Sequence, residues 1–132
     1  MLLVVDEADA PRVRGYEEQP GRARFPRSRA SAAIQATVLA HDGRTLSRVS
    51  LHDLALAHPH LQPLPGDEIL LVGARCKRLA DGTAEHNAHI YGSDGLLRRT
   101  ATFGDGIANV QATTSGDIWV SYFDEGIFGN YG

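Results

Sequence analysis

The sequence predicts an all-β protein in which one antiparallel unit recurs about every fifty residues. Residues 61–72 and residues 110–121 share the same order of apolar, polar and turn residues at an offset of 49. A second pattern, over residues 36–51, returns at residues 88–103. The chain has no long amphipathic helical pattern, and a fixed period of this length is the signature of a repeat architecture.

Composition and charge describe an ordinary globular chain. At 132 residues it is long enough for one domain, and we expect residues 1–132 to form one. Apolar residues make up 42% of the chain and charged residues 22%, and the net charge of -3 indicates no special partner. Cys76 is the single cysteine, which excludes an intramolecular disulfide and fits a reducing compartment. No signal peptide or membrane-spanning segment is recognisable. We therefore expect a cytoplasmic protein that does not bind membranes.

The first unit, residues 1–51, is expected to hold three strands and one long loop. The apolar run 2–5 is short enough to favour a strand. Residues 6–32 are rich in Pro, Gly, Arg and Glu without a regular period, which predicts a long surface loop. Residues 34–40 alternate in character and are followed by Asp42-Gly43 and a β-rich run to residue 51, which is a strong hairpin signal.

The remaining residues predict one complete unit, 52–103, and one partial unit, 104–132. The complete unit holds four expected strands near residues 60–64, 68–76, 84–92 and 96–103, and its last turn is Asp94-Gly95. The partial unit holds strands at 107–113 and 117–123, joined by a turn over 115–117.

The residue pattern of the last unit is similar to that of a known repeat. It reads Ile107-x2-Val110-x5-Gly116-Asp117-Ile118-Trp119-Val120-x5-Gly126-Ile127. This pattern resembles the repeat of regulator-type and NHL-type β-propellers and, more distantly, a blade of the gluconolactonase/SMP-30 family. The resemblance implies an incomplete β-propeller-like array of four-stranded antiparallel blades, with one full blade flanked by two partial ones.

A propeller needs at least four blades, and this sequence contains fewer than three. We therefore expect either a part of a longer protein or a chain that completes its blades by self-association. A small open β-sheet protein is the third alternative.

In a propeller, the longer connections between strands share one rim and the tight turns share the other. In this sequence the turns expected on one rim are tight, whereas the connections expected on the other rim are longer and chemically varied. We therefore expect function at the longer connections. The expected activity is binding of a small molecule or a protein, without catalysis by this chain alone. The candidate residues on this rim are His52, Asp53, His58, His60, Glu85, His86, Asn109, Asp124, Glu125 and Asn130.

An enzyme is the alternative hypothesis. The gluconolactonase resemblance implies a metal-dependent lactonase or related hydrolase in which Asp105 is the catalytic, metal-binding carboxylate. Asn109 and Asp124 would add oxygen ligands to a divalent cation, and the cation would activate water. The competing interpretation is that Gly104-Asp105-Gly106 is a turn in which Asp bonds to the backbone.

Three further residue groups are interpreted as structural. The segment His58-Pro59-His60, near His52, has imidazoles that suit zinc, but its spacing matches no ligand motif. Cys76 lies between Arg75 and Lys77, whose charges could lower its thiol pKa, but a small buried thiol is more common.

Arginines are concentrated in the third group, one segment near the start of the chain. Residues 12–29 hold six arginines against two glutamates, so they could meet phosphates. They contain no nucleic-acid-binding motif, and we expect a solvated loop rather than a nucleic-acid partner. The whole chain has one lysine, Lys77, against twelve arginines, a bias typical of GC-rich bacterial genes.

Overall fold

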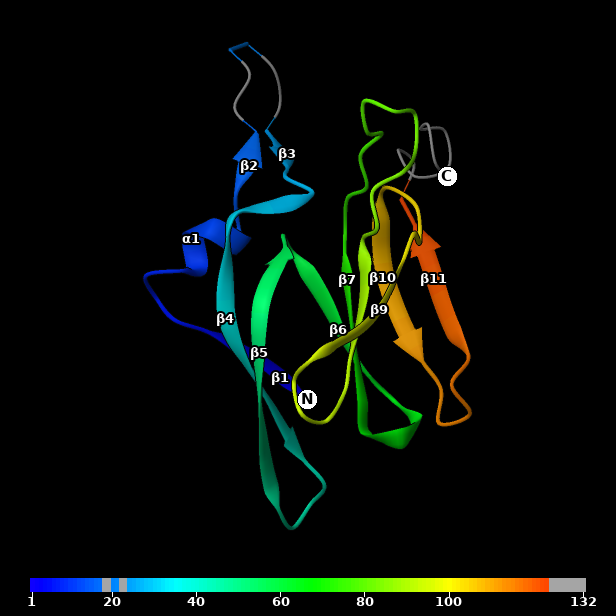
Figure 1. Ribbon diagram of the computed structural model, residues 1–132. Helices are drawn as coiled ribbons and strands as arrows, with labels where there is room; N and C mark the ends of the chain where they lie inside the picture. Colours follow the sequence, from blue (N-terminus) through cyan, green and yellow to red (C-terminus); the bar gives the residue numbers. More distant parts are fainter. Residues whose placement is uncertain (18–19, 22–23, 124–132) are drawn as a thin grey trace.

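The computed structural model describes residues 1–17, 20–21 and 24–123. Over these residues the chain is all-β apart from one short α-helix and one 3₁₀ turn, which confirms the predicted class (Figure 1). No helix in this part of the chain is long and apolar enough to cross a membrane. The elements are β1 (Leu2–Val5), α1 (Ala10–Val13), β2 (Tyr16–Glu17), β3 (Phe25–Pro26), β4 (Arg29–His41), β5 (Leu46–Leu56), β6 (Pro59–Leu64), η1 (Pro65–Asp67), β7 (Glu68–Gly73), β8 (Ala88–Tyr91), β9 (Leu97–Ala101), β10 (Ile107–Ala112) and β11 (Ile118–Tyr122).

The strands form three successive antiparallel sheets and one small hairpin. The first sheet has the order β1-β4-β5, the middle sheet β6-β7-β8-β9, and the last sheet is the pair β10-β11. The hairpin β2-β3 stands apart from them. The hairpins expected at residues 34–51, 88–103 and 107–123 are all present. Among the described residues no sheet closes on itself.

The hairpin turns follow from local side-chain chemistry. In the β4–β5 turn the Asp42 carboxylate accepts hydrogen bonds from the backbone N–H groups of Arg44 and Thr45, at 2.8 and 2.7 Å. In the β8–β9 turn Gly95 adopts a φ of 77°. A Cβ atom at Gly95 would lie 1.9 Å from the carbonyl oxygen of Ser50 on β5, so glycine alone fits. This turn therefore also docks the middle sheet on the first.

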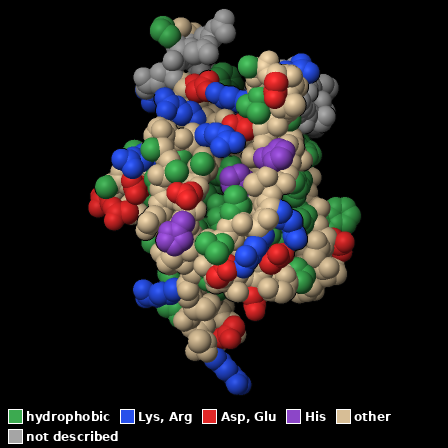
Figure 2. Space-filling model, viewed as in Figure 1, with side chains coloured by type: hydrophobic (Ala, Val, Ile, Leu, Met, Phe, Trp, Pro, Cys, Tyr) green, Lys and Arg blue, Asp and Glu red, His purple; other side chains and the backbone are tan. Residues whose placement is uncertain are grey.

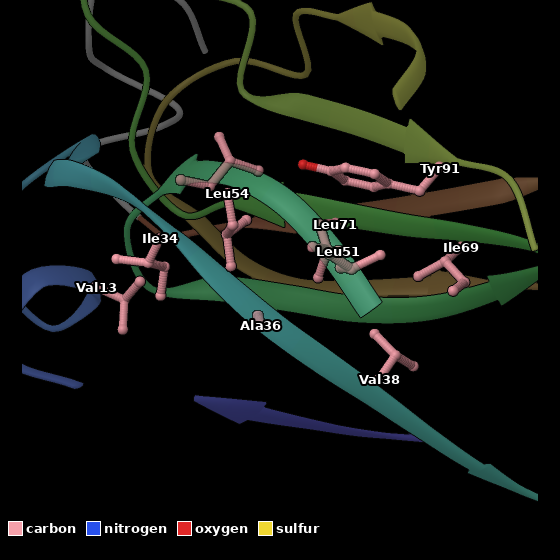
Figure 3. Packing of buried hydrophobic residues seen from close by; sticks show 10 residues of the cluster. Val13, Ile34, Ala36, Val38, Leu51, Leu54, Ile69, Leu71 and Tyr91 are labelled. Carbon is pink, nitrogen blue, oxygen red and sulfur yellow. The ribbon is translucent and has the colours of Figure 1, made fainter. Parts of the chain in front are cut away.

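The middle sheet lies between the other two and contributes side chains to two cores. Alternate residues of a strand point to opposite faces. Ile69, Leu71 and Tyr91 face the first sheet, where they pack with residues such as Leu51 and Leu54 (Figure 3). On the opposite face, the core combines middle-sheet residues with the β10-β11 pair; its buried members are Leu70, Val72, Ala88, Ile90, Ile107 and Val110. Each fully buried Leu or Ile contributes about 1.5–3 kcal/mol, so β7 stabilises both interfaces.

A loop is expected over residues 6–32, and this expectation is wrong for much of the segment that the structure describes. Pro11 lies in the first turn of α1, where a proline is tolerated, and Val13 at its end is buried. Strand β4 begins at Arg29, paired with Leu56, rather than near residue 34. These elements form because distant parts of the chain contact them, and such contacts leave no local periodicity.

The pairing of β5 with β4 is irregular near the end of β5. Strand β5 continues to Leu56, and register shifts opposite Ile34 accommodate Asp53 at a φ of 58°. Such an irregularity in a strand pair re-aims side chains without ending the pairing.

Candidate binding rim

The longer connections between the strands gather at one end of the molecule. Figure 1 shows the hairpin β2-β3 and the connections 74–87 and 102–106 at the upper end, and the tight turns after β4, β6, β8 and β10 at the lower end. We call the described part of residues 6–28, with residues 57–58, 74–87 and 102–106, the long-connection rim. Backbone hydrogen bonds tie its segments together, among them His58 N–H to the Val13 carbonyl (2.9 Å) and Ile107 N–H to the Ala74 carbonyl (2.9 Å).

One buried amide organises the base of this rim. Asn87 is 1% exposed, and its side-chain N–H groups donate to the carbonyl oxygens of Gly73 and Gly104, at 2.9 and 2.8 Å. Its side-chain oxygen accepts the backbone N–H of Phe103 at 2.9 Å. The residue thereby links the ends of β7 and β9 to the start of β8. Sequence analysis missed Asn87, although a polar amide directly before an apolar strand was an available signal.

Asp105, the candidate catalytic residue, forms a two-pronged ion pair with Arg75. The Arg75 Nε and Nη2 atoms each lie 2.9 Å from an oxygen of the carboxylate, and Cys76 N–H donates to Asp105 Oδ1 at 2.7 Å. The guanidinium carbon of Arg75 lies 5.9 Å from the ring centroid of Phe25 and 5.8 Å from that of Phe123. Paired and stacked in this way, both charged groups are held in fixed positions.

Glu85, one of the predicted rim residues, joins three segments. Its side chain is buried, and Arg29 Nε donates to Oε1 at 2.5 Å while the Lys77 backbone N–H donates to Oε2 at 3.1 Å. The Lys77 ammonium in turn pairs with Glu17 of β2 and lowers the pKa of that carboxyl. A carboxylate this buried requires such partners. Glu85 therefore acts as a buried structural link within the rim, between β4 and the connection 74–87.

The Cys76 thiol is not activated by its cationic neighbours. Burial raises its pKa to about 11, and the nearby charges of Glu85 and Asp105 act in the same direction. The thiol donates to the Glu85 carbonyl oxygen at 3.2 Å. Cys76 is consequently protonated at neutral pH and behaves as a small buried side chain.

The candidate histidines do not gather at one point. His52 is exposed on β5, beside Asp53. His58 Nε2 lies 3.1 Å from the Gly15 carbonyl oxygen, and its ring meets Tyr16 edge-on. Burial within β6 lowers the pKa of His60. No group of three or more His, Cys, Asp or Glu side chains that could hold a metal exists in the part of the chain that the structure describes.

The other candidates have local partners or fall beyond the described residues. His86 Nδ1 lies 2.7 Å from Thr100 Oγ1, and Asn109 Oδ1 accepts the N–H of the following residue, Val110, at 2.9 Å. The three candidates of the C-terminal segment lie outside the described residues: Asp124, Glu125 and Asn130.

A buried pair on β8 was also missed by sequence analysis. His89 is 7% exposed, and the Tyr91 hydroxyl lies 3.5 Å from its Nδ1 atom. Burial lowers the pKa of His89 and raises the pKa of Tyr91 to about 12. Both groups are therefore neutral at physiological pH.

Comparison with known proteins gives no assignment. No protein-family model, no curated protein and no solved structure matches this chain. A functional assignment therefore rests on the antiparallel all-β class and on the geometry of the rim.

Proposed function

We propose that the chain is a binding module that engages a small molecule or a protein through the long-connection rim, on an incomplete β-propeller-like framework. The strand order of the middle sheet, β6-β7-β8-β9, is that of a single blade. The first strands of the last two sheets, β6 and β10, contact one another, and Ala112 N–H donates to Gln62 Oε1 at 3.1 Å. Successive sheets packed face to face with adjacent first strands support this framework.

The observation that carries the functional proposal is that, within the long-connection rim, the arginine-rich segment is held against the connection 74–87. The Lys77–Glu17 and Arg29–Glu85 ion pairs and the stacking of Arg75 on Phe25 attach residues 15–29 to the connection 74–87. Figure 2 shows basic and acidic side chains interleaved at this end of the molecule. A loop surface held by partly buried charges is pre-ordered for binding, which lowers the entropy cost of association.

The excess of arginine in residues 12–29 favours a partner that carries acidic groups. Exposed basic side chains attract such a partner and raise its local concentration. Arg14 and Arg27 are exposed members of this segment, whereas Arg44 and Arg48 are exposed at or beside the tight turn of β4–β5, at the opposite end. These two pairs provide a matched test.

The experiment measures binding of defined anionic probes by calorimetry: inorganic phosphate, gluconate, a nucleoside triphosphate and a short polyglutamate peptide. We expect at least one probe to bind the wild type. The R14E/R27E variant should weaken that binding by at least tenfold, and the R44E/R48E variant should leave it unchanged. Equal losses in both variants would indicate net-charge attraction alone, and absence of binding by every probe would reject an acidic partner for the rim.

The hydrolase alternative has no supporting contact among the described residues, because Asp105 is already engaged by Arg75 and Cys76. A metal would have to displace a bidentate guanidinium to reach that carboxylate. We expect Ca²⁺, Mg²⁺, Mn²⁺ and Zn²⁺ to leave the melting temperature unchanged. A metal-dependent rise that D105N abolishes would restore the hydrolase hypothesis.

A further inference from the structure

The outer face of the last sheet exposes a large aromatic side chain. Along β11 the residues alternate: Ile118, Val120 and Tyr122 pack toward the middle sheet, whereas Trp119 and Ser121 point away from it. Trp119 is 69% exposed, more than any other large hydrophobic residue described. An exposed tryptophan on the open face of a strand pair is a characteristic anchor of an interface.

The internal repeat shows what this face does elsewhere in the chain. At the offset of 49 residues, Trp119 corresponds to Leu70 and Ser121 corresponds to Val72. Leu70 and Val72 are both 0% exposed, because the β10-β11 pair packs on them. The same position is thus buried by the following sheet in one unit and uncovered in the next.

A complementary face lies at the other end of the stack of sheets. On β1, Leu3 and Val5 pack toward the middle sheet, whereas Leu2 and Val4 point outward and are 61% and 41% exposed. Leu39 of β4 is paired with Leu2 and therefore lies on the same outward face. The first sheet thus presents an aliphatic face in the direction from which a preceding sheet would pack.

We propose that the Trp119 face of one copy docks on the Leu2, Val4 and Leu39 face of a second copy, which continues the stacking seen within the chain. The occupant is a second copy because the chain itself carries the aliphatic sheet face that the series of sheets requires. The contact is head-to-tail, because it joins two different surfaces. Further copies therefore add in the same way, and the assembly either closes into a ring or grows as an open fibre. This surface is separate from the long-connection rim, and either proposal can fail without the other.

The test uses the single tryptophan of the chain as its probe. Light scattering behind a sizing column gives the mass of the full chain over a concentration series, and tryptophan emission reports burial of Trp119. We expect the mass to rise with concentration while the emission shifts to the blue. W119E and V4E should each weaken association by about 30-fold or more, as expected for the loss of an interface anchor. Circular dichroism verifies that both variants keep the wild-type fold.

Mixing the two variants identifies the geometry. Each variant retains one intact face, so an equimolar mixture of W119E and V4E should form a heterodimer while each alone stays monomeric. An isologous contact between two Trp119 faces would instead leave V4E able to dimerise, which would reject the head-to-tail arrangement. L96E, which adds the same charge at an exposed leucine of the β8–β9 turn, should associate like the wild type.

Two further outcomes decide the proposal. A wild-type monomer with solvent-exposed emission at every concentration would overturn it, since another partner would then have to cover Trp119. Open-ended aggregates that W119E abolishes would support it, and aggregates that W119E leaves unchanged would overturn it.

Discussion

The buried side chain of Asn87 makes three hydrogen bonds in the long-connection rim. Replacing it with leucine would leave the carbonyl oxygens of Gly73 and Gly104 and the N–H of Phe103 buried without partners. Each such group costs about 1–3 kcal/mol, and relaxation recovers part of the loss, so we expect N87L to lower the free energy of unfolding by about 3 kcal/mol. Urea denaturation measures this change.

Asn109 provides the matched control for that substitution. It is exposed, and its side-chain oxygen accepts the N–H of the adjacent Val110, so N109L should change stability by less than about 0.5 kcal/mol. Equal effects of N87L and N109L would show that the buried amide has no special role in the rim.

The partly buried His60 and the buried His89 give the fold a pH dependence near neutrality. Burial lowers the pKa of His60 and His89 below the ordinary value of 6.5, so the unfolded chain binds protons more readily than the folded one. The stability they contribute is complete above about pH 6.5 and is lost as the pH falls through their lowered folded values. We expect the wild-type melting temperature to decrease between pH 7.5 and about 5, before most carboxyl groups titrate.

The pH profile of H60Q/H89Q tests this assignment. The double variant should show a flatter decrease over the same window, whatever its absolute melting temperature. H52Q, which removes an exposed histidine of β5, should retain the wild-type profile. Parallel profiles of wild type and double variant would assign the acid sensitivity to other groups.

At the scale of single elements, the turn at Gly95 joins two sheets. Any side chain there needs both a φ of 77° and space that the Ser50 carbonyl occupies. We expect G95A to destabilise the fold by about 2–4 kcal/mol, because strain and a backbone clash add. Gly43 also has a positive φ but nothing lies within 4 Å of its Cβ position, so G43A should cost only about 1 kcal/mol.

Thermal unfolding of the two glycine variants separates the cost of the clash with the Ser50 carbonyl from the cost of a positive φ. A larger loss for G95A would support the role of the β8–β9 turn in docking the middle sheet. Similar losses would mean that the positive φ alone determines the cost and that the turn moves freely away from Ser50.

The elements that sequence patterns predicted are those whose information is local. The hairpins over 34–51 and 88–103 have alternating strands and an Asp-Gly turn within a few residues of each other. In contrast, α1 and the early start of β4 depend on contacts with residues more than 25 positions away, such as Val13 with His58. The ordered structure of the rim likewise could not be predicted from the sequence, because it depends on the pairing of Arg75 with Asp105 and of Glu85 with Arg29. Charge and spacing identified Asp105 and Glu85 as notable but could not reveal that each already has a partner.

At the scale of the whole molecule, the middle sheet makes the three sheets interdependent. Leu71 faces the first sheet and is fully buried, while its neighbours Leu70 and Val72 face the β10-β11 pair. We expect L71A to lower the free energy of unfolding by about 2–5 kcal/mol, the usual cost of a buried leucine-to-alanine change. Since β7 belongs to both cores, that loss should extend to amides of β10 that Leu71 does not face.

Native-state hydrogen exchange, followed peptide by peptide, measures this coupling. Stacked sheets that contact only their neighbours can unfold separately or as one, depending on the strength of their interfaces. For L71A we expect protection in β4 and in β10 to decrease by the same free energy, because global unfolding limits both. L97A, at an exposed position of β9, should leave both unchanged. If β10 keeps its wild-type protection in L71A while β4 loses it, the sheets are independent units. The stability of the Trp119 face would then depend on the β7-facing contacts of β10 and β11 alone.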